Sequence, residues 1–291
     1  MKLDKEKVFP IIINALTEDM GSGDVTSELL FGKDVNVMAG IFAKGDCILA
    51  GIDVARWLFQ IIDEKIIFRP LFKDGDRIKK GKKIIFLKGS AKNILAGERT
   101  ALNFIGRLSG IATLTDRFVG KVKEKSVKIF DTRKTTPGLR ILEKYAVTLG
   151  SGYNHRMGLW DGILIKDNHL AGLFQGGIKD VLRIAKARGH KNVEIEVNDL
   201  KEFKEALDAG ADIIMLDNMD IEDIRKAVKL CRDFRLRRTP KGKGGGTSPL
   251  LEVSGGVTLE NVAKLAKTGI DRISIGFLTH SAPSIDFSLE I

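Results

Sequence analysis

The sequence has few cysteines and no long apolar run, and each absence excludes a class of protein. Only Cys47 and Cys231 occur among 291 residues, without CxxC or Cys/His spacing. Neither a disulfide framework nor a structural zinc site is therefore supported. Apolar runs such as 11–13 and 84–87 fall far short of the roughly 20 residues that cross a bilayer. We expect no membrane span and no membrane partner.

The N-terminal segment 1–9 also lacks the features of a secretory signal. It has acids among its lysines and no apolar stretch followed by small residues, so a cytoplasmic protein is expected. Hydrophobic residues make up 43% of the chain and charged residues 30%, which is typical of a folded globular protein. The length allows one large domain or two smaller ones.

Positive charge is in excess, with a formal net charge of +10 at pH 7. This favours anionic partners: nucleic acid, acidic lipid or phosphorylated small molecules. Many lysines are scattered, as at 79–83 and 121–125, where solvated helix faces are the simplest explanation. The basic residues inside motifs are therefore the informative ones.

The first hundred or so residues mix helical and strand patterns. Residues 8–16 have the spacing of an amphipathic helix, and four strand-like segments follow, at 35–43, 47–50, 66–71 and 84–88. This pattern predicts a small α+β domain. Apolar positions then recur at helical spacing over 93–119, with Gly110 expected to separate two helices.

Beyond this point, short apolar runs alternate with amphipathic helical segments. The runs are 127–130, 162–165, 193–197, 213–216, 250–253 and 272–275. Repeated βα units predict a parallel sheet, either a closed barrel or a doubly wound sheet. Polar residues or glycines follow every run, which favours a barrel, because its strand ends converge on one mouth. Six runs are fewer than eight, so an incomplete barrel is expected.

Two segments after these runs are rich in cations. Segment 131–137 places Arg133 and Lys134 beside three threonines, and Thr136 with Pro137 is expected to start a helix. Helix N-termini favour anions, and the planar guanidinium of Arg133 suits a carboxylate or phosphate. A charged loop with threonine caps explains the segment equally well. His155 and Arg156, before a run that leads to Lys166, add further candidate anion ligands.

Acids and glycines are also expected at the strand ends of the predicted barrel. Glu196 and Asp217 lie at or near strand ends. Two carboxylates that face a polyphosphate commonly hold Mg²⁺, directly or through water, so these two acids are candidate Mg²⁺ ligands. They could instead hold ribose hydroxyls or neutralise the lysines. Residues 254–256 and Gly276 follow two late strands, where backbone N–H groups of barrels commonly bind phosphate. Tight βα turns also need glycine.

Several longer motifs occur in a fixed order along nearly the whole chain. They are GDVTS (23–27), GERTALN (97–103), DTRKTTPGLR (131–140), NHRMGL (154–159), IKDNH (165–169) and SGG (254–256). In these motifs the chain resembles the quinolinate phosphoribosyltransferase family. The resemblance implies an incomplete, about seven-stranded β/α barrel over 109–278 and an open-faced α+β domain over 1–108, which the tail 279–291 joins.

The resemblance also implies an activity: transfer of phosphoribose from phosphoribosyl pyrophosphate to quinolinate with decarboxylation, which gives nicotinate mononucleotide in NAD biosynthesis. Mg²⁺ at Glu196 and Asp217 is implied, as is a homodimer or higher homo-oligomer in which Arg99 reaches the site of the other subunit. The expected quinolinate ligands are Arg99, Thr132, Arg133, Lys134, His155, Arg156 and Lys166. The expected phosphoribosyl pyrophosphate ligands are Lys134, Glu196, Asp217, Ser254, Gly255, Gly256 and Gly276. Lys134, Lys166, Glu196 and Asp217 are expected to be catalytic.

Three features depart from the family pattern. Segment 235–246 is longer and more basic than usual, Phe277 replaces a small residue near the phosphate pocket, and Asn198 stands where a second acid is frequent. Two rival functions follow. One is a related phosphoribosyltransferase for another ring acid, such as the paralogue associated with molybdate transport genes. The other is a nucleic-acid-binding protein, which the strand-end acids disfavour, because they would repel a phosphate backbone.

Overall fold

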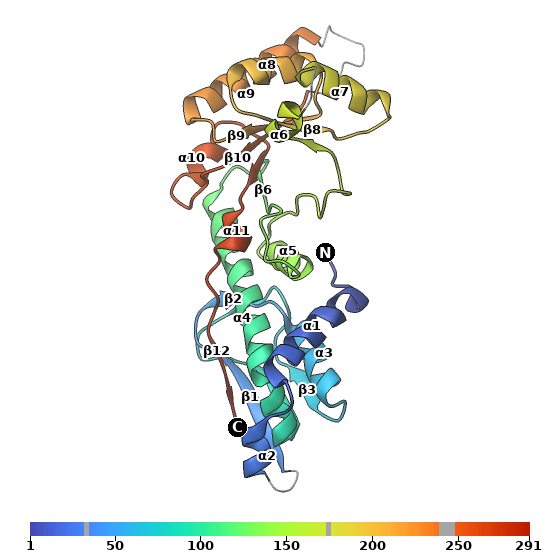
Figure 1. The fold of residues 1–291 in the computed structure, drawn as a ribbon. Helices are drawn as coiled ribbons and strands as arrows, with labels where there is room; N and C mark the ends of the chain where they lie inside the picture. The colour runs from blue at the N-terminus through green and yellow to red at the C-terminus, as the bar shows by residue number, and fades with distance from the viewer. Residues whose placement is uncertain (32–34, 173–175, 239–247) are drawn as a thin grey trace. The chain divides into compact units, whose positions relative to one another are not determined.

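The structure, a computed structural model, describes residues 1–31, 35–172, 176–238 and 248–291. Most of the basic segment 235–246 lies outside these ranges. The chain forms two compact units (Figure 1). Unit 1 comprises Met1–Arg117, Lys134–Gly152 and Leu278–Ile291, and unit 2 comprises Phe118–Arg133 and Tyr153–Phe277. The expected domain division at 108/109 stays a prediction, since the units group the chain by contacts and assign 109–117 and 134–152 to unit 1.

Unit 1 is built on a four-stranded antiparallel sheet in the order β12-β1-β5-β3. Its strands are β1 (Asn36–Ala43), β3 (Ile67–Pro70), β5 (Lys83–Ser90) and β12 (Phe287–Glu290), and β2 (Cys47–Ile48) pairs with β4 (Arg77–Ile78). Its helices are α1 (Lys5–Met20), α2 (Val25–Leu30), α3 (Ile52–Ile62), α4 (Ala91–Lys121) and α5 (Arg140–Leu149), with residues 118–121 of α4 in unit 2. The tail therefore returns to this sheet as β12.

Helix α4 is continuous over 31 residues, so the expected break at Gly110 is wrong. A Cβ at Gly110 would lie 2.1 Å from the carbonyl oxygen of Pro283, and one at Gly106 would lie 2.7 Å from that of Ile285. The Ile285 amide also donates to the Gly106 carbonyl at 3.0 Å. These glycines therefore serve close packing of the C-terminal segment against α4, which helix spacing alone does not reveal.

The expected helix start at Pro137 is also wrong, because α5 begins at Arg140. Gly138, directly after Pro137, has φ of +80°. A residue in this conformation cannot continue a right-handed helix. Thr136 instead donates through its backbone N–H and its hydroxyl to Glu143, at 3.1 and 2.8 Å.

Unit 2 contains six parallel strands in the order β6-β11-β10-β9-β8-β7. They are β6 (Lys128–Phe130), β7 (Leu164–Ile165), β8 (Glu194–Val197), β9 (Ile213–Asp217), β10 (Leu250–Ser254) and β11 (Arg272–Ser274). Each lies in one of the six runs or extends it by one residue, and the mixed α/β class with a separate antiparallel sheet is confirmed. About seven strands were expected; in the described ranges, Tyr153 adds one isolated parallel bridge to Phe130.

Helices alternate with these strands, as the βα pattern predicts. They are α6 (Asp167–Ala171), α7 (Ile178–Ala187), α8 (Leu200–Asp208), α9 (Ile221–Arg238) and α10 (Val262–Ala266), and the short α11 (Phe277–His280) follows β11. Asp199 caps α8 by accepting from the amides of Lys201 and Glu202 at 2.8 Å. None of the helices in the described part of the chain is long and apolar enough to cross a bilayer.

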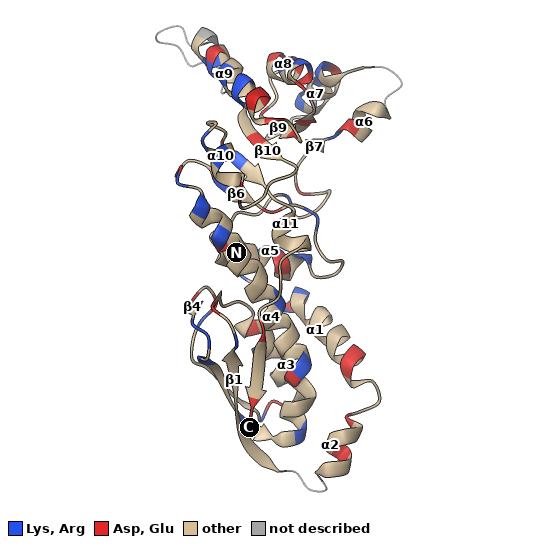
Figure 2. Cartoon of the chain, turned by 90° about the vertical axis from the view of Figure 1, so that its left-hand side faces the viewer, with Lys and Arg blue, Asp and Glu red and all other residues tan. Residues whose placement is uncertain are grey.

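Acids and bases are interspersed on the helices of unit 2. Figure 2 shows lysines and arginines beside aspartates and glutamates on α7, α8 and α9. On α9, Arg225 pairs with Glu222 at 2.6 Å and Lys226 with Asp223 at 2.8 Å. Such pairs are typical of solvated helix faces. The helix faces expected at 79–83 are wrong, because residues 79–82 form an exposed turn between β4 and β5 and Lys83 begins β5. In 121–125, only Lys121 lies in a helix.

Candidate active site

The carboxyl ends of the parallel strands in unit 2 carry most of the predicted site residues. Eleven of them belong to this unit: Thr132, Arg133, His155, Arg156, Lys166, Glu196, Asp217, Ser254, Gly255, Gly256 and Gly276. Asp217 of β9 pairs in register with Ser254 of β10, which pairs with Ser274 of β11. Arg99 and Lys134 belong to unit 1, and their part in this site stays a prediction.

The guanidinium group of Arg156 is partly buried, and the charge of Arg133 acts on it. The pKa of Arg156 is lowered from its usual value, first by burial and then by the charge of Arg133, while Glu194 and Asp161 act in the opposite direction. Arg156 donates through Nη1 to the carbonyl oxygen of Gly162 at 3.2 Å. Like charges held together in a partly buried place are relieved by an anion. The arrangement is therefore suited to a carboxylate or phosphate.

Asp131 fixes the chain that carries these cations. It is fully buried after β6, and it accepts from Asn154 Nδ2 at 2.6 Å and from the His155 amide at 2.9 Å. A charged acceptor for a side chain and a backbone N–H holds a loop firmly. Asp131 therefore ties segment 154–156 to the end of β6.

His155 lies between two acids that the sequence analysis did not single out. Its Nε2 is 3.1 Å from Glu194 Oε2 and 3.6 Å from Glu252 Oε1. Glu252 is fully buried, and burial together with the charge of Glu194 raises its pKa to about 7. The alternation of side chains along a strand could have identified both acids, because residues two apart lie on the same face of a sheet. Glu194 precedes Glu196 by two residues and Glu252 precedes Ser254 by two, so each acid shares a face with a predicted site residue.

Lys166 and Glu196 form an ion pair between the end of β7 and β8. Glu196 is buried, whereas the side chain of Lys166 is 41% exposed. The backbone N–H of Lys166 donates to His169 Nδ1 at 2.9 Å, which fixes the turn into α6. A predicted quinolinate ligand and a predicted ribose or Mg²⁺ ligand are thus brought together.

Asp217 and the glycine turn after β10 are joined through Asn218. Asn218 donates through Nδ2 to Asp217 Oδ2 at 2.8 Å and through its backbone to the Ser254 carbonyl at 2.9 Å. A Cβ at Gly255, whose φ is +87°, would lie 2.1 Å from Asn218 Oδ1. Packing against Asn218 therefore requires this glycine. Gly256, with φ of +59°, has no atom within 4 Å of an added Cβ, which leaves open space beside its backbone.

The role of Glu196 and Asp217 as Mg²⁺ ligands stays a prediction. In the ranges that the structure describes, the one group of three or more His, Cys, Asp or Glu side chains with ligand atoms within 4.8 Å of one another is His155, Glu194 and Glu252. Glu196 and Asp217 belong to no such group in these ranges. Mg²⁺ often takes one or two carboxylates and completes its shell with water and phosphate oxygens.

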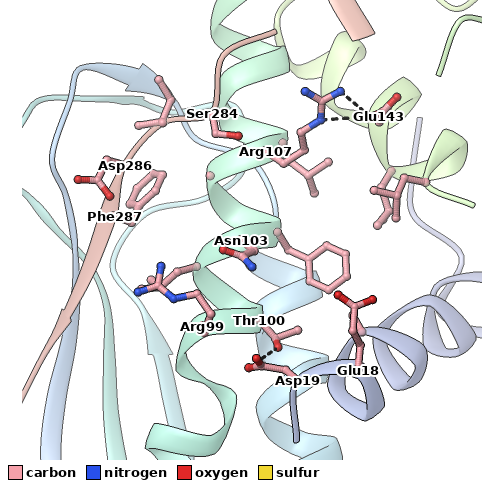
Figure 3. Close-up of a pocket in the computed structure, with 18 residues that line it drawn as sticks. Glu18, Asp19, Arg99, Thr100, Asn103, Arg107, Glu143, Ser284, Asp286 and Phe287 are labelled. Carbon is pink, nitrogen blue, oxygen red and sulfur yellow. Dashed lines mark hydrogen bonds and ion pairs between the residues drawn. The ribbon is translucent and has the colours of Figure 1, made fainter. Parts of the chain in front are cut away.

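Arg99 lines a pocket within unit 1 (Figure 3). The pocket has a volume of about 630 Å³ and is lined by residues of α1, α4, α5 and the C-terminal segment. Arg99 is exposed on α4, and its neighbour Thr100 donates to Asp19 of α1 at 3.4 Å. On another wall, buried Glu143 accepts from Arg107 at 2.8 Å. Lys134, also in unit 1, is exposed, and its carbonyl accepts from the Thr279 hydroxyl at 2.7 Å.

Comparison with known proteins shows the family of the chain. Residues 24–109 match the N-terminal domain model of quinolinate phosphoribosyl transferase, and residues 111–290 match its C-terminal domain model. The chain belongs to the quinolinate phosphoribosyltransferase family. It is 45% identical over 276 residues to a probable nicotinate-nucleotide pyrophosphorylase (carboxylating) of Bacillus subtilis, covering 94% of this chain and 90% of the relative. A protein of the same description from Methanocaldococcus jannaschii is 42% identical, covering 99% and 98%.

Solved structures of this family have the same fold. A nicotinate-nucleotide pyrophosphorylase from Francisella tularensis superposes with a TM-score of 0.89 at 38% identity, covering 99% of this chain and 97% of the other. One from Ehrlichia chaffeensis gives a TM-score of 0.88 at 36% identity, covering 100% and 99%. The predicted membership of the quinolinate phosphoribosyltransferase family is thereby confirmed.

Proposed function

We propose that this chain transfers the phosphoribosyl group of phosphoribosyl pyrophosphate to quinolinate with decarboxylation. The products are nicotinate mononucleotide, pyrophosphate and CO₂, in NAD biosynthesis. Membership of the quinolinate phosphoribosyltransferase family over nearly the whole chain supports the reaction. The observation that carries the assignment of the site is the ion pair between Lys166 and buried Glu196, in the unit that also holds Arg133 and Arg156.

The cations of the site would hold the two carboxylates of quinolinate. Arg133, Arg156 and Lys166 are the cations of unit 2 in this role, with Thr132 as a polar neighbour and His155 beside them. Guanidinium groups bind carboxylates through two parallel hydrogen bonds. Lys166 already pairs with Glu196, so substrate binding would exchange one carboxylate partner for another. Lys134 would contact both substrates.

The chemistry needs positioning and charge more than a nucleophilic side chain. The pyridine nitrogen attacks the anomeric carbon of phosphoribosyl pyrophosphate, and the bond to the pyrophosphate oxygen breaks. An oxocarbenium-like state is stabilised by alignment of the two substrates and by nearby carboxylates. The positive charge of the quaternised ring nitrogen then stabilises the electron pair that stays on C2 when the neighbouring carboxylate leaves as CO₂, and C2 takes up a proton. Lys134, Lys166, Glu196 and Asp217 are the residues proposed to take part.

Phosphoribosyl pyrophosphate would bind across the ends of β8 to β11. Ser254, Gly255, Gly256 and Gly276 are proposed to surround its phosphate, and the open space beside Gly256 supports this role. Glu196 and Asp217 would hold ribose hydroxyls or Mg²⁺. When bound, Mg²⁺ would neutralise charge on the pyrophosphate leaving group. The exposed side chain of Phe277 follows Gly276 directly, so it would border this phosphate.

A homodimer, or a higher homo-oligomer, is proposed to complete the site with Arg99 of one subunit. The exposure of Arg99 in a pocket of unit 1 supports an interaction outside its own helix. The cytoplasmic location also stays a prediction.

Purified protein with phosphoribosyl pyrophosphate, Mg²⁺ and ring-acid substrate tests the proposal. We expect turnover of quinolinate, measured as nicotinate mononucleotide and as CO₂ from quinolinate labelled in its 2-carboxyl group. Nicotinate serves as the comparison substrate, because it lacks this carboxylate. Turnover of nicotinate alone would favour the related phosphoribosyltransferases and contradict the assignment to quinolinate.

A further inference from the structure

Both ring nitrogens of His155 face groups of the protein. Nδ1 accepts a hydrogen bond from the backbone N–H of Arg156 at 2.8 Å. A nitrogen that accepts carries no proton, so a neutral ring carries its proton on Nε2. Nε2 lies 3.1 Å from Glu194 Oε2 and 3.6 Å from Glu252 Oε1. The imidazole therefore links two buried carboxylates to the backbone of Arg156.

The two carboxylates are held in place by their own strands. Glu194 lies on β8 and Glu252 on β10, and both are buried. Ser274 of β11 donates to Glu252 Oε1, and Arg272 Nη1 approaches Glu252 Oε2 at 3.8 Å. Side chains on regular strands with such contacts are more firmly placed than side chains on loops. They form a rigid base for His155, whose side chain is only 10% exposed.

A metal ion does not explain this cluster. Its three ligand atoms lie close enough for one, but coordination by Nε2 needs a lone pair on that nitrogen. With Nδ1 accepting from Arg156, Nε2 carries a proton and donates to Glu194, while Glu252 lies next to it at 3.6 Å. These contacts do not need an ion.

We propose that Glu194 and Glu252 are positioning residues for Arg156, acting through His155. The inference rests on the proposed function, in which Arg156 binds a carboxylate of quinolinate. A guanidinium group binds a carboxylate through two parallel hydrogen bonds only when its orientation is fixed. Three contacts fix its segment: Asp131 holds the His155 amide, the His155 ring holds the Arg156 amide, and the Gly162 carbonyl holds its guanidinium. His155 then contributes to quinolinate binding through Arg156 and not as a separate ligand.

A double-mutant cycle tests this pathway. We expect His155→Phe, which keeps a ring and removes both hydrogen bonds, to raise the KM for quinolinate about tenfold and to leave the KM for phosphoribosyl pyrophosphate within about twofold. In an Arg156→Ala background the same change should have little further effect. Additive effects in the cycle would mean that His155 binds quinolinate directly, and they would overturn the inference.

Variants of Glu252 extend the test to the carboxylates. Glu252→Leu should raise the KM for quinolinate selectively, whereas Glu252→Gln, which keeps an acceptor oxygen, should recover most of the binding. Asp271→Asn is the matched control. Asp271 accepts from the Leu251 amide at 2.8 Å, at the N-terminal ends of β10 and β11, away from the carboxyl ends that carry the site. It should leave both KM values unchanged. An equal rise of both KM values in Glu252→Leu would indicate a merely structural role and contradict the proposal.

A readout without substrate separates this inference from the proposed function. The chain has only four histidines, so the imidazole nitrogens of ¹⁵N-labelled protein are resolvable by NMR. We expect His155 to be protonated on Nε2 and unprotonated on Nδ1. The opposite tautomer, or a shift on adding Zn²⁺ or Mg²⁺, would overturn the network even in an active enzyme. A protein with the expected tautomer and no quinolinate turnover would instead contradict the proposed function alone. If Glu252→Leu fails to fold, the double-mutant cycle with His155→Phe and the NMR spectrum still test the positioning of Arg156 through His155.

Discussion

At the scale of single residues, the surroundings of Glu252 oppose its ionisation. Burial and the charge of Glu194 raise its pKa to about 7, while His155, Arg272 and the Ser274 hydroxyl act in the opposite direction. The unfolded chain would bind this proton with the ordinary value near 4.5. An acid whose pKa is raised on folding favours the native state at low pH, and this contribution is lost as the pH rises toward 7.

Replacing Glu252 by glutamine should therefore change how stability depends on pH. Between pH 5 and pH 8 the wild-type protein should lose stability relative to Glu252→Gln, by at most on the order of 3 kcal/mol. Denaturant unfolding at several pH values measures the difference, in which the contributions of other titrating groups largely cancel. Parallel stability curves for the two proteins would show that Glu252 titrates normally.

Gly255 gives a second prediction at this scale. Its φ of +87° and the contact of 2.1 Å between an added Cβ and Asn218 Oδ1 both oppose a side chain. Gly255→Ala should destabilise the protein by about 1–3 kcal/mol and raise the KM for phosphoribosyl pyrophosphate. Gly256→Ala is the comparison, because the added Cβ meets no atom there, and it should cost less stability. Adding Asn218→Gly should recover part of what Gly255→Ala loses; equal stabilities of the two alanine variants would contradict the contact.

At the scale of elements, the strands of unit 2 were predictable, whereas the role of Gly110 in α4 was not. The six apolar runs of unit 2 all contain strands, because parallel strands buried on both faces consist of nearly continuous apolar residues, as in β9. Once the strands were predicted, the cations and acids that follow them could be placed at the carboxyl ends of the sheet. Gly110 was misinterpreted, since its role depends on the segment around Pro283, which is remote in the sequence. Glu194 and Glu252 were overlooked, although alternation along β8 and β10 places them on the face of Glu196 and Ser254.

The packing of the C-terminal segment against α4 is testable with two glycines of the same helix. Gly110→Ala should destabilise unit 1 by about 1–3 kcal/mol, because the added Cβ would overlap the Pro283 carbonyl and the segment would have to move. Gly120→Ala, where nothing lies within 4 Å, should instead stabilise the helix by about 0.5–1 kcal/mol. Denaturant unfolding of both variants measures this. A stabilising effect at both positions would contradict the close approach.

At the scale of the whole molecule, the predicted site draws on both units of the chain. Eleven of its residues belong to unit 2, while Arg99 and Lys134 belong to unit 1. The sequence motifs contain ten of the thirteen, and the family resemblance added Glu196, Asp217 and Gly276. A family pattern records which residues act together without regard to which subunit supplies them. The proposed contribution of Arg99 across a dimer interface can be tested by combining variants of the two units in one dimer.

Co-expression of two inactive variants with different tags tests whether sites are shared between subunits. Arg99→Ala and Lys166→Ala should each be nearly inactive as homodimers. A heterodimer of the two has one site that lacks both groups and one site that keeps both, so random pairing should restore about a quarter of wild-type activity. Lys166→Ala with Arg156→Ala is the control, because both residues belong to unit 2 and no intact site can form. Activity of the first mixture no higher than that of the control would mean that Arg99 serves its own subunit.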